Sequence, residues 1–401
     1  MKKTGQHQRR IAATRWLRAS GAPAAAIFVL AALGIPPAQA QTYKILLNFP
    51  ASASGGENPY YGSLIRDTAG NLYGTTNGGG GANYGVVFEL HTTGKEKVLH
   101  SFGGFADGAN PVAGVIFDSA GNLYGTTYFG GASGQGVVFK LDTTRTETVL
   151  YSFTGGADGG SPRSSLIRDS AGNLYGTTEY GGASGQGTVF KLDAAGTESV
   201  LYSFRGRADG ATPVAGLVRD SAGNLYGTTY NGGASGFGVV FKVNTAGKET
   251  VLHSFAGGAD GANPYAGLIR DSAGNFYGTT FYGGASNYGI VFKVDTTRTE
   301  TVLYSFTGGA DGGNPSAGVI RDSAGNLYGA TTIGGAPGMG YGVVFELDTA
   351  GTETVLHTFA GGAGGANPVG GLIRDSAGNL YGTTQDGGSS GNDGLVFEIT
   401  P

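Results

Sequence analysis

One short motif recurs along the chain at a nearly constant interval, and this regularity limits the folds that the chain can adopt. The motif Gly-Asn-Leu/Phe-Tyr-Gly starts at Gly70, Gly121, Gly172, Gly223, Gly274, Gly325 and Gly378. Its copies are 51 residues apart, except the last, which follows after 53. A β-helix would need a much shorter period, whereas units of about 50 residues are typical of propeller blades.

Each unit contains four short segments with the β-branched and aromatic composition of strands. In the fifth unit they are residues 266–270, 275–280, 290–294 and 301–306. The tetrads 271–274 and 295–298 suit type I turns whose fourth residue is left-handed. Glycine supplies 79 of the 401 residues and disfavours helices, because it costs about 1 kcal/mol relative to alanine within a helix. The sequence therefore predicts an all-β fold, a seven-bladed β-propeller with four antiparallel strands per blade.

The two chain ends predict how the ring of blades closes. The turn between the third and fourth strands occurs six times, at residues 91–94, 142–145, 193–196, 244–247, 295–298 and 348–351. The seventh copy would fall between Ile399 and Tyr43, at the two ends of the chain. We therefore expect residues 43–49 to form the outer strand of the last blade, 369–399, which leaves no blade edge unpaired.

Residues 1–40 have the features of a secretory signal peptide. Six basic residues precede an apolar run at 24–35, and Ala38-Gln39-Ala40 provides a cleavage site. An apolar run of this length is too short to span a bilayer. The pair Arg9-Arg10 leaves the twin-arginine route open beside the favoured general route. Cleavage after Ala40 would leave 41–401 as a single propeller domain outside the cytoplasm, extracellular, periplasmic or on the cell surface.

The chain that remains after this cleavage is acidic. It keeps 25 − 6 = 19 Lys and Arg residues against 29 Asp and Glu, a formal charge of −10. This excess of negative charge argues against nucleic acid or an anionic membrane as a partner. The chain has no cysteine, which excludes a disulfide framework and thiol chemistry, although export would permit disulfides.

The complete repeat unit resembles a known one. Residues 118–127, followed by 136–139 and 148–153, are similar to the unit of GloVer-type (choice-of-anchor) tandem repeat proteins, an exported bacterial family. The unit is more distantly similar to NHL and kelch-like propeller repeats. The resemblance covers residues 41–401 and implies an exported repeat domain, often tethered by a C-terminal sorting tail, with no established activity or catalytic residues. Because the chain ends at Pro401 without a hydrophobic or basic tail, we expect release rather than tethering.

The histidines and the recurring acidic residues are expected to have structural roles. His100, His253 and His357 alternate with tyrosine in one outer-strand slot, and His91 falls in a turn. The aspartate that opens the first turn of each unit recurs seven times, as turn capping predicts, at Asp67, Asp118, Asp169, Asp220, Asp271, Asp322 and Asp375. A second acidic slot holds Asp107, Asp158, Asp209, Asp260 and Asp311. It lacks the alternating carboxylates of an EF-hand loop, so calcium is a minor alternative and neither a metal site nor a cofactor is expected.

Six arginines directly precede the turn aspartates, at Arg66, Arg168, Arg219, Arg270, Arg321 and Arg374. Near the central channel they would form a basic collar for an anion. Ion pairs with neighbouring acidic side chains are the favoured interpretation.

Repeat symmetry argues against catalysis, because acid–base chemistry needs unlike groups at one point and seven copies give rings of like groups. No catalytic residues are predicted. The units differ most in the loops after the second strand, which should emerge on the same face as the loops after the fourth. The aromatic residues of these loops are the candidate ligand-binding residues, Tyr84, Tyr128, Phe129, Tyr180, Tyr230, Phe237, Phe281, Tyr282, Tyr288 and Tyr341. Aromatic faces beside amide groups suit sugar rings or peptides, and packing between blades is the alternative.

Three functions remain open on this evidence. The favoured one is a monomeric, non-enzymatic binding or scaffold module that recognises an extracellular or envelope polysaccharide or protein. The second is a secreted polysaccharide lyase or hydrolase, which needs unlike polar groups to converge at the mouth of the channel. The third is a structural surface protein without a small ligand.

Overall fold

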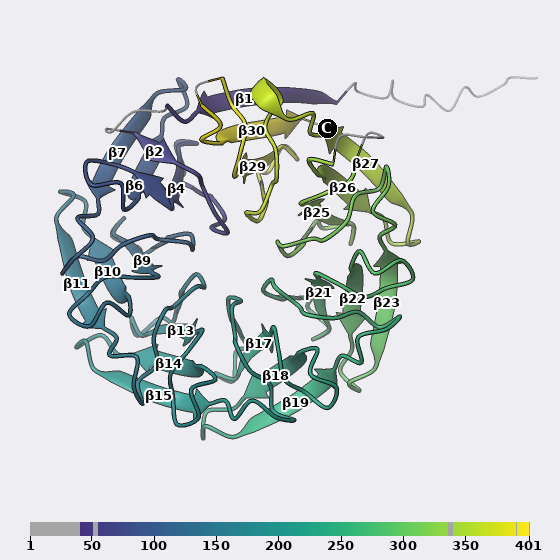
Figure 1. Cartoon of the computed structure of the whole chain (residues 1–401), viewed down its shortest axis with the longest axis horizontal. Helices are drawn as coiled ribbons and strands as arrows, with labels where there is room; N and C mark the ends of the chain where they lie inside the picture. The colour runs from purple at the N-terminus through teal and green to yellow at the C-terminus, as the bar shows by residue number, and fades with distance from the viewer. Residues whose placement is uncertain (1–40, 51–54, 336–339, 390, 401) are drawn as a thin grey trace, which may run out of the picture. The chain divides into compact units, whose positions relative to one another are not determined.

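Seven four-stranded antiparallel sheets follow one another around a ring (Figure 1). The structure is a computed structural model that describes residues 41–50, 55–335, 340–389 and 391–400. This arrangement confirms the seven-bladed β-propeller. The predicted signal peptide, residues 1–40, lies outside the described residues. Within the described part of the chain, no helix is long and apolar enough to cross a membrane.

The strands of each blade fall into four classes, ordered from the ring centre outward. The innermost are β3 (Ile65–Arg66), β8 (Ile116–Phe117), β12 (Ile167–Arg168), β16 (Val218–Arg219), β20 (Ile269–Arg270), β24 (Ile320–Arg321) and β28 (Ile373–Arg374). The second are β4 (Leu72–Thr76), β9 (Leu123–Thr127), β13 (Leu174–Thr178), β17 (Leu225–Thr229), β21 (Phe276–Thr280), β25 (Leu327–Thr331) and β29 (Leu380–Thr384). The third are β6 (Val86–Leu90), β10 (Val137–Leu141), β14 (Thr188–Leu192), β18 (Val239–Val243), β22 (Ile290–Val294), β26 (Val343–Leu347) and β30 (Leu395–Thr400). The outermost are β7 (Glu96–Ser101), β11 (Glu147–Ser152), β15 (Glu198–Ser203), β19 (Glu249–Ser254), β23 (Glu300–Ser305), β27 (Glu353–Thr358) and β1 (Thr42–Asn48).

Two small elements lie in the loops between these strands. The pair β2 (Gly56–Glu57) and β5 (Gly78–Gly79) forms a separate two-stranded sheet in the first unit. A single 3₁₀ turn, η1 (Gly362–Gly364), lies in the loop that leads to the last blade.

The innermost strand is shorter than the sequence predicts. We expected a strand over 266–270, but only Ile269–Arg270 pairs with β21. The carbonyl of Ala266 instead accepts a hydrogen bond from Thr228 Oγ1 of the preceding blade, at 3.0 Å. Thr279 Oγ1 makes the same contact with the Ala317 carbonyl at 2.9 Å, and the equivalent bond forms at five of the seven blade junctions. The start of these inner segments is therefore tied to the neighbouring blade and not to its own sheet.

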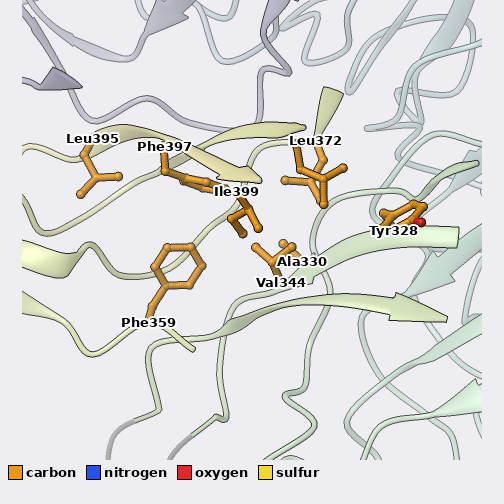
Figure 2. Packing of buried hydrophobic residues seen from close by; sticks show 9 residues of the cluster. Tyr328, Ala330, Val344, Phe359, Leu372, Leu395, Phe397 and Ile399 are labelled. Carbon is orange, nitrogen blue, oxygen red and sulfur yellow. The ribbon is translucent and has the colours of Figure 1, made fainter. Parts of the chain in front are cut away.

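The hydrophobic core lies between neighbouring blades. In the cluster of Figure 2, Phe359 of the sixth blade packs edge-on against Phe397 of the seventh, with ring centroids 5.3 Å apart. A Cβ on Gly382 would lie 2.6 Å from Phe397 Cζ, so the second strand needs glycine where the ring crosses it. Equivalent clusters join the other blades, such as the one that combines Phe102 with Phe139.

The N-terminal strand closes the ring as predicted. β1 pairs antiparallel with β30, with Tyr43 opposite Ile399 and Ile45 opposite Phe397. The Tyr43 ring stacks on His357 of the sixth blade with centroids 3.8 Å apart, and its hydroxyl donates to the Gly364 carbonyl at 3.0 Å. The last blade therefore combines both ends of the chain.

The turn aspartates cap their turns, as expected. In the second blade Asp118 Oδ1 accepts the N–H groups of Ala120 and Asn122, while Oδ2 accepts the Asn122 amide and the Tyr124 hydroxyl. Burial raises the pKa of Asp118, but the hydrogen bonds from Asn122 and Tyr124 outweigh it and lower the pKa to about 2. The oxygens of these carboxylates are therefore hydrogen-bonded to the turn and to the tyrosine of the repeat motif.

The arginines beside these turns do not form the predicted ion pairs. Among the described residues no ion pair involves them. Five of the six guanidinium groups instead lie over the tyrosine of the preceding blade, as Arg168 lies over Tyr124 with 5.8 Å from Cζ to the ring centroid. The repeat tyrosine offers a ring face to these five arginines, and a planar guanidinium can stack on an aromatic ring as readily as it can pair with a carboxylate.

The second acidic slot explains why histidine and tyrosine alternate on the outer strands. Asp209 Oδ2 accepts the Tyr202 hydroxyl at 2.7 Å, and Asp260 Oδ2 lies 3.6 Å from His253 Nε2. His91 lies in its predicted turn, where its N–H bonds to the Lys95 carbonyl. The structural interpretation of the histidines is confirmed by these contacts. Within the described residues, no group of three or more His, Cys, Asp or Glu side chains could hold a metal ion.

Candidate functional site

The ten aromatic candidates separate into two groups with different surroundings. The first group consists of Tyr84, Phe237, Tyr288 and Tyr341, whose rings lie against the glycines Gly104, Gly257, Gly308 and Gly361 of the loop after the fourth strand. A Cβ on any of these glycines would lie 2.2 to 2.7 Å from the ring. These four rings therefore hold two loops of one blade together.

The second group lies on the second to fifth blades, at the start of the loops that follow the second strands β9, β13, β17 and β21. It consists of Tyr128, Phe129, Tyr180, Tyr230, Phe281 and Tyr282, which we call the aromatic band. Phe129, Tyr180 and Tyr282 are 49%, 48% and 40% exposed. Tyr128 packs on Phe129 with centroids 4.5 Å apart, and Phe281 on Tyr282 at 4.8 Å. Their strands β9 and β21 lie on opposite sides of the ring (Figure 1).

Between the two sides of the aromatic band, five side chains of three types meet at the axis. They are Tyr60, Tyr61, Arg163, Glu179 and Tyr265, which we call the axial cluster. Tyr61 of the first blade and Tyr265 of the fifth have ring centroids 4.8 Å apart, and Arg163 Cζ lies 4.8 and 5.1 Å from the two. Side chains separated by about two hundred residues thus come into contact.

The charges of the axial cluster are paired and largely buried. Arg163 Nη1 donates to Glu179 Oε2 at 3.4 Å, and the two side chains are 18% and 7% exposed. Arg163 Nε is buried and has no hydrogen-bond partner among the described residues. A buried donor without an acceptor costs free energy, so this nitrogen is open to an acceptor that arrives with a ligand or water.

Tyr60 and Tyr265 of the axial cluster stay protonated at neutral pH. Burial raises the pKa of Tyr265 far above its usual value, and the Arg163 charge opposes this without reversing it. Burial also raises the pKa of Tyr60 to about 12. These hydroxyls can donate and accept hydrogen bonds, but they are poor candidates for a general base.

The axial cluster borders a cavity of about 260 Å³ on the ring axis. Its wall includes residues from all seven inner segments, with Tyr61, Arg163 and Tyr265 among them. The rest of the wall consists mainly of small residues, which include the serines Ser63, Ser164, Ser165 and Ser316. The volume is close to the lower end of the range for small-molecule sites.

The aromatic band and the axial cluster are continuous. Tyr265 lies 5.5 Å from Tyr230 and 6.1 Å from Phe281, measured between ring centroids. On the other side the Glu179 charge raises the pKa of Tyr128, after the larger effect of burial. The arrangement offers ring faces, hydroxyls and one paired guanidinium across the axis, which suits recognition of a hydroxyl-rich ligand.

The sequence interpretation missed the axial cluster. Three of its residues, Tyr60, Arg163 and Tyr265, follow the proline that begins each inner segment. The other four units place smaller side chains there, Val112, Val214, Ser316 and Val369. The sequence signal for these residues is a departure from the repeat at the position after the proline, outside the variable loops from which the candidate residues were predicted. The expectation that only rings of like groups form is therefore wrong at the axis.

A second cavity of about 440 Å³ lies where the first and last blades meet. Its wall includes Lys44, Arg66, His91 and Glu398. Lys44 and Glu398 form an ion pair at 3.7 Å across the β1–β30 ladder, so this cavity belongs to the ring closure. None of the candidate aromatic residues reaches it.

Comparison with known proteins identifies the repeat family and finds structures with a similar fold. The model of the Gloeobacter/Verrucomicrobia repeat matches residues 34–241 and 216–401. Virginiamycin B lyase from Staphylococcus aureus is similar over 90% of this chain and 99% of the lyase, with a TM-score of 0.59 and 11% identity. The extracellular domain of a B. thetaiotaomicron protein described as a one-component system is similar over 90% of this chain and 40% of that one, with a TM-score of 0.53 and 11% identity. At this identity the two likenesses show the fold alone. The comparison with curated proteins finds no match.

Proposed function

The chain belongs to the Gloeobacter/Verrucomicrobia repeat family, and from that premise we propose that it is an exported, non-enzymatic binding protein. Its ligand is an extracellular or envelope polysaccharide or protein, recognised by the aromatic band and the axial cluster. The convergence of Tyr61, Arg163 and Tyr265 on the axis carries the proposal, because it is the place where the seven-fold pattern is broken by side chains suited to recognition. Export is supported by the features of residues 1–40.

Of the two ligand classes, the contacts favour a polysaccharide. Ring faces at partial exposure, such as Phe129 and Tyr282, offer flat apolar surfaces for sugar rings. Tyrosine hydroxyls and the paired Arg163 and Glu179 offer donors and acceptors beside them. A protein partner would be expected to need a larger apolar patch at the centre of its interface.

Binding is tested by replacing two exposed and two half-buried rings of the aromatic band. The variant Tyr128→Ala, Phe129→Ala, Phe281→Ala, Tyr282→Ala, in residues 41–401, should bind about tenfold or more weakly, because central aromatic residues dominate binding energy. The measurement is a glycan array with polysaccharide pull-down, with and without calcium. The matched control is Phe105→Ala, which removes an aromatic ring that is 80% exposed and lies outside the band. Equal binding by the quadruple variant and the control, with both folded, would contradict the proposal.

A polysaccharide lyase or hydrolase is the second candidate, since unlike groups do meet at the axis. Arg163, Glu179 and a tyrosine hydroxyl are the groups that such chemistry would use. Glu179 is 7% exposed and paired with Arg163, and burial keeps the Tyr265 hydroxyl protonated, so neither of these two groups is well placed to act as a general base. Release of reducing ends or unsaturated products from a bound polysaccharide would favour this candidate over binding alone. A folded protein that binds no glycan and no protein would favour the structural role.

A further inference from the structure

The chemistry of the axial cluster narrows the ligand class further than the proposed function does. We infer that the site takes an internal segment of a neutral glycan chain, with one sugar unit over Arg163. This inference rests on the proposed function and adds two properties to it, the absence of charge on the ligand and recognition away from the chain ends.

The first property follows from the charges around the axis. Arg163 is compensated by Glu179 at 3.4 Å, and the Asp386 charge also reaches the cluster, where it raises the pKa of Tyr60 after burial and Tyr61. The formal charges of these three groups sum to −1. Residues 41–401 as a whole carry −10, so the long-range potential also repels an anion. A carboxylated or sulfated chain would meet a guanidinium that is already paired.

The hydrogen-bonding groups that remain suit neutral hydroxyls. Arg163 Nε has no hydrogen-bond partner among the described residues, so a ligand oxygen that reaches this buried nitrogen can accept from it without displacing Glu179. The hydroxyls of Tyr60 and Tyr265 are protonated and can both donate and accept hydrogen bonds. A sugar hydroxyl can also both donate and accept, so two neighbouring hydroxyls of a sugar can form hydrogen bonds with the guanidinium and with a tyrosine at the same time.

The second property follows from the position of the aromatic band on both sides of the axis. Tyr128 and Phe129 directly follow β9 of the second blade, and Phe281 and Tyr282 directly follow β21 of the fifth. These two strands lie across the ring from each other (Figure 1). A ligand that ended at Arg163 would leave one of these sides without contact. A chain that continues past Arg163 in both directions can stack on both.

The test compares matched neutral and acidic polymers on the same backbone. Affinity electrophoresis of residues 41–401 would use hydroxyethyl cellulose against carboxymethyl cellulose, and carboxyl-reduced against native polygalacturonate. We expect any retardation to favour the neutral member of each pair and to change less than about twofold between low salt and physiological salt, since screening matters only for charged ligands. The variants are Arg163→Gln, which keeps hydrogen-bond donors without the charge, Tyr61→Ala with Tyr265→Ala, and the control Phe105→Ala.

The outcomes separate this inference from the proposed function. We expect Arg163→Gln to weaken binding of the neutral polymer by less than about tenfold, and the tyrosine pair by about tenfold or more. The inference would be overturned if the protein preferred the acidic polymer and if this binding were lost in the Arg163→Gln variant and at higher salt. The proposed function would then remain in place. Binding that disappears when chain ends are reduced or capped would overturn recognition of internal segments. Failure to bind any glycan on a broad array, by folded protein, would overturn both.

Discussion

A chain that begins at residue 51 is expected to lose cooperative folding. Without residues 41–50, β30 would become an exposed edge with six unpaired register partners. The core between the last and first blades would also lose Phe49, which is 1% exposed, and the contacts of Leu46 and Leu47. Loss of one buried phenylalanine costs about 3–5 kcal/mol, and the whole stability of a domain is about 5–15 kcal/mol.

Thermal unfolding followed by circular dichroism measures this effect, with the chain that begins at residue 41 as the control. We expect the truncated chain to show no sharp transition and to regain one when a peptide of residues 41–50 is added. Tyr43 and His357 should be close in the restored complex, because their rings stack at 3.8 Å. A truncated chain that unfolds cooperatively within about 5 °C of the control would contradict ring closure by β1.

Stability is expected to be highest at mildly acidic pH and to fall between pH 5 and pH 8. Five outer-strand glutamates have a pKa that is raised to about 7. The main cause is burial, and the second is the charge of an aspartate in the loop that leads into the same blade. The five are Glu147, Glu198, Glu249, Glu300 and Glu353. In each of them Oε1 is buried without a hydrogen-bond partner. A carboxyl whose pKa is raised by folding stabilises the folded state below its unfolded pKa, and this contribution is lost as the pH rises through about 7.

Other titrating groups act at lower pH or in smaller number. Burial lowers the pKa of His100, His253 and His357, so they destabilise the fold only as the pH falls below about 6.5. The turn aspartates have lowered pKa values, as for Asp118 at about 2, and their contribution is lost only below about pH 4. Above pH 6.5 the glutamates act alone.

Thermal unfolding of residues 41–401 across this pH range checks the prediction. We expect a Tm at pH 5 that is about 5 °C or more above the Tm at pH 8. Replacing the five glutamates with glutamine should raise the Tm at pH 8 and flatten the profile. A Tm that rises between pH 5 and pH 8 would show that these side chains are solvated in the folded state.

The fold could be predicted because the repeat makes each local signal appear seven times. One Gly-Asn-Leu-Tyr-Gly motif would be a weak turn signal, but its constant interval defines a blade. The count of six turns against seven copies of the other elements placed Tyr43 beside Ile399, and the register confirms it. The short inner strand escaped prediction because its backbone bonds to Thr228 of another blade, which a local pattern does not reveal.

The candidate site could be predicted only in part, because its residues are far apart in the chain. The loops supplied Tyr128 and Phe281, which do lie near the axis. Tyr84 and Phe237 are also aromatic residues of these variable loops, yet their rings pack on glycines of their own blades. Arg163 and Tyr265 meet only because the ring closes, so their contact depends on the geometry of all seven blades.

Glycan recognition on the ring axis is best examined in a crystal structure of residues 41–401 with the tightest-binding oligosaccharide. We expect a sugar unit over Arg163, within hydrogen-bond distance of its Nε or of a tyrosine hydroxyl, with further units on the Phe129 and Tyr282 sides. An oligosaccharide bound elsewhere, such as beside Lys44 and Arg66 where the first and last blades meet, with none on the axis, would contradict it.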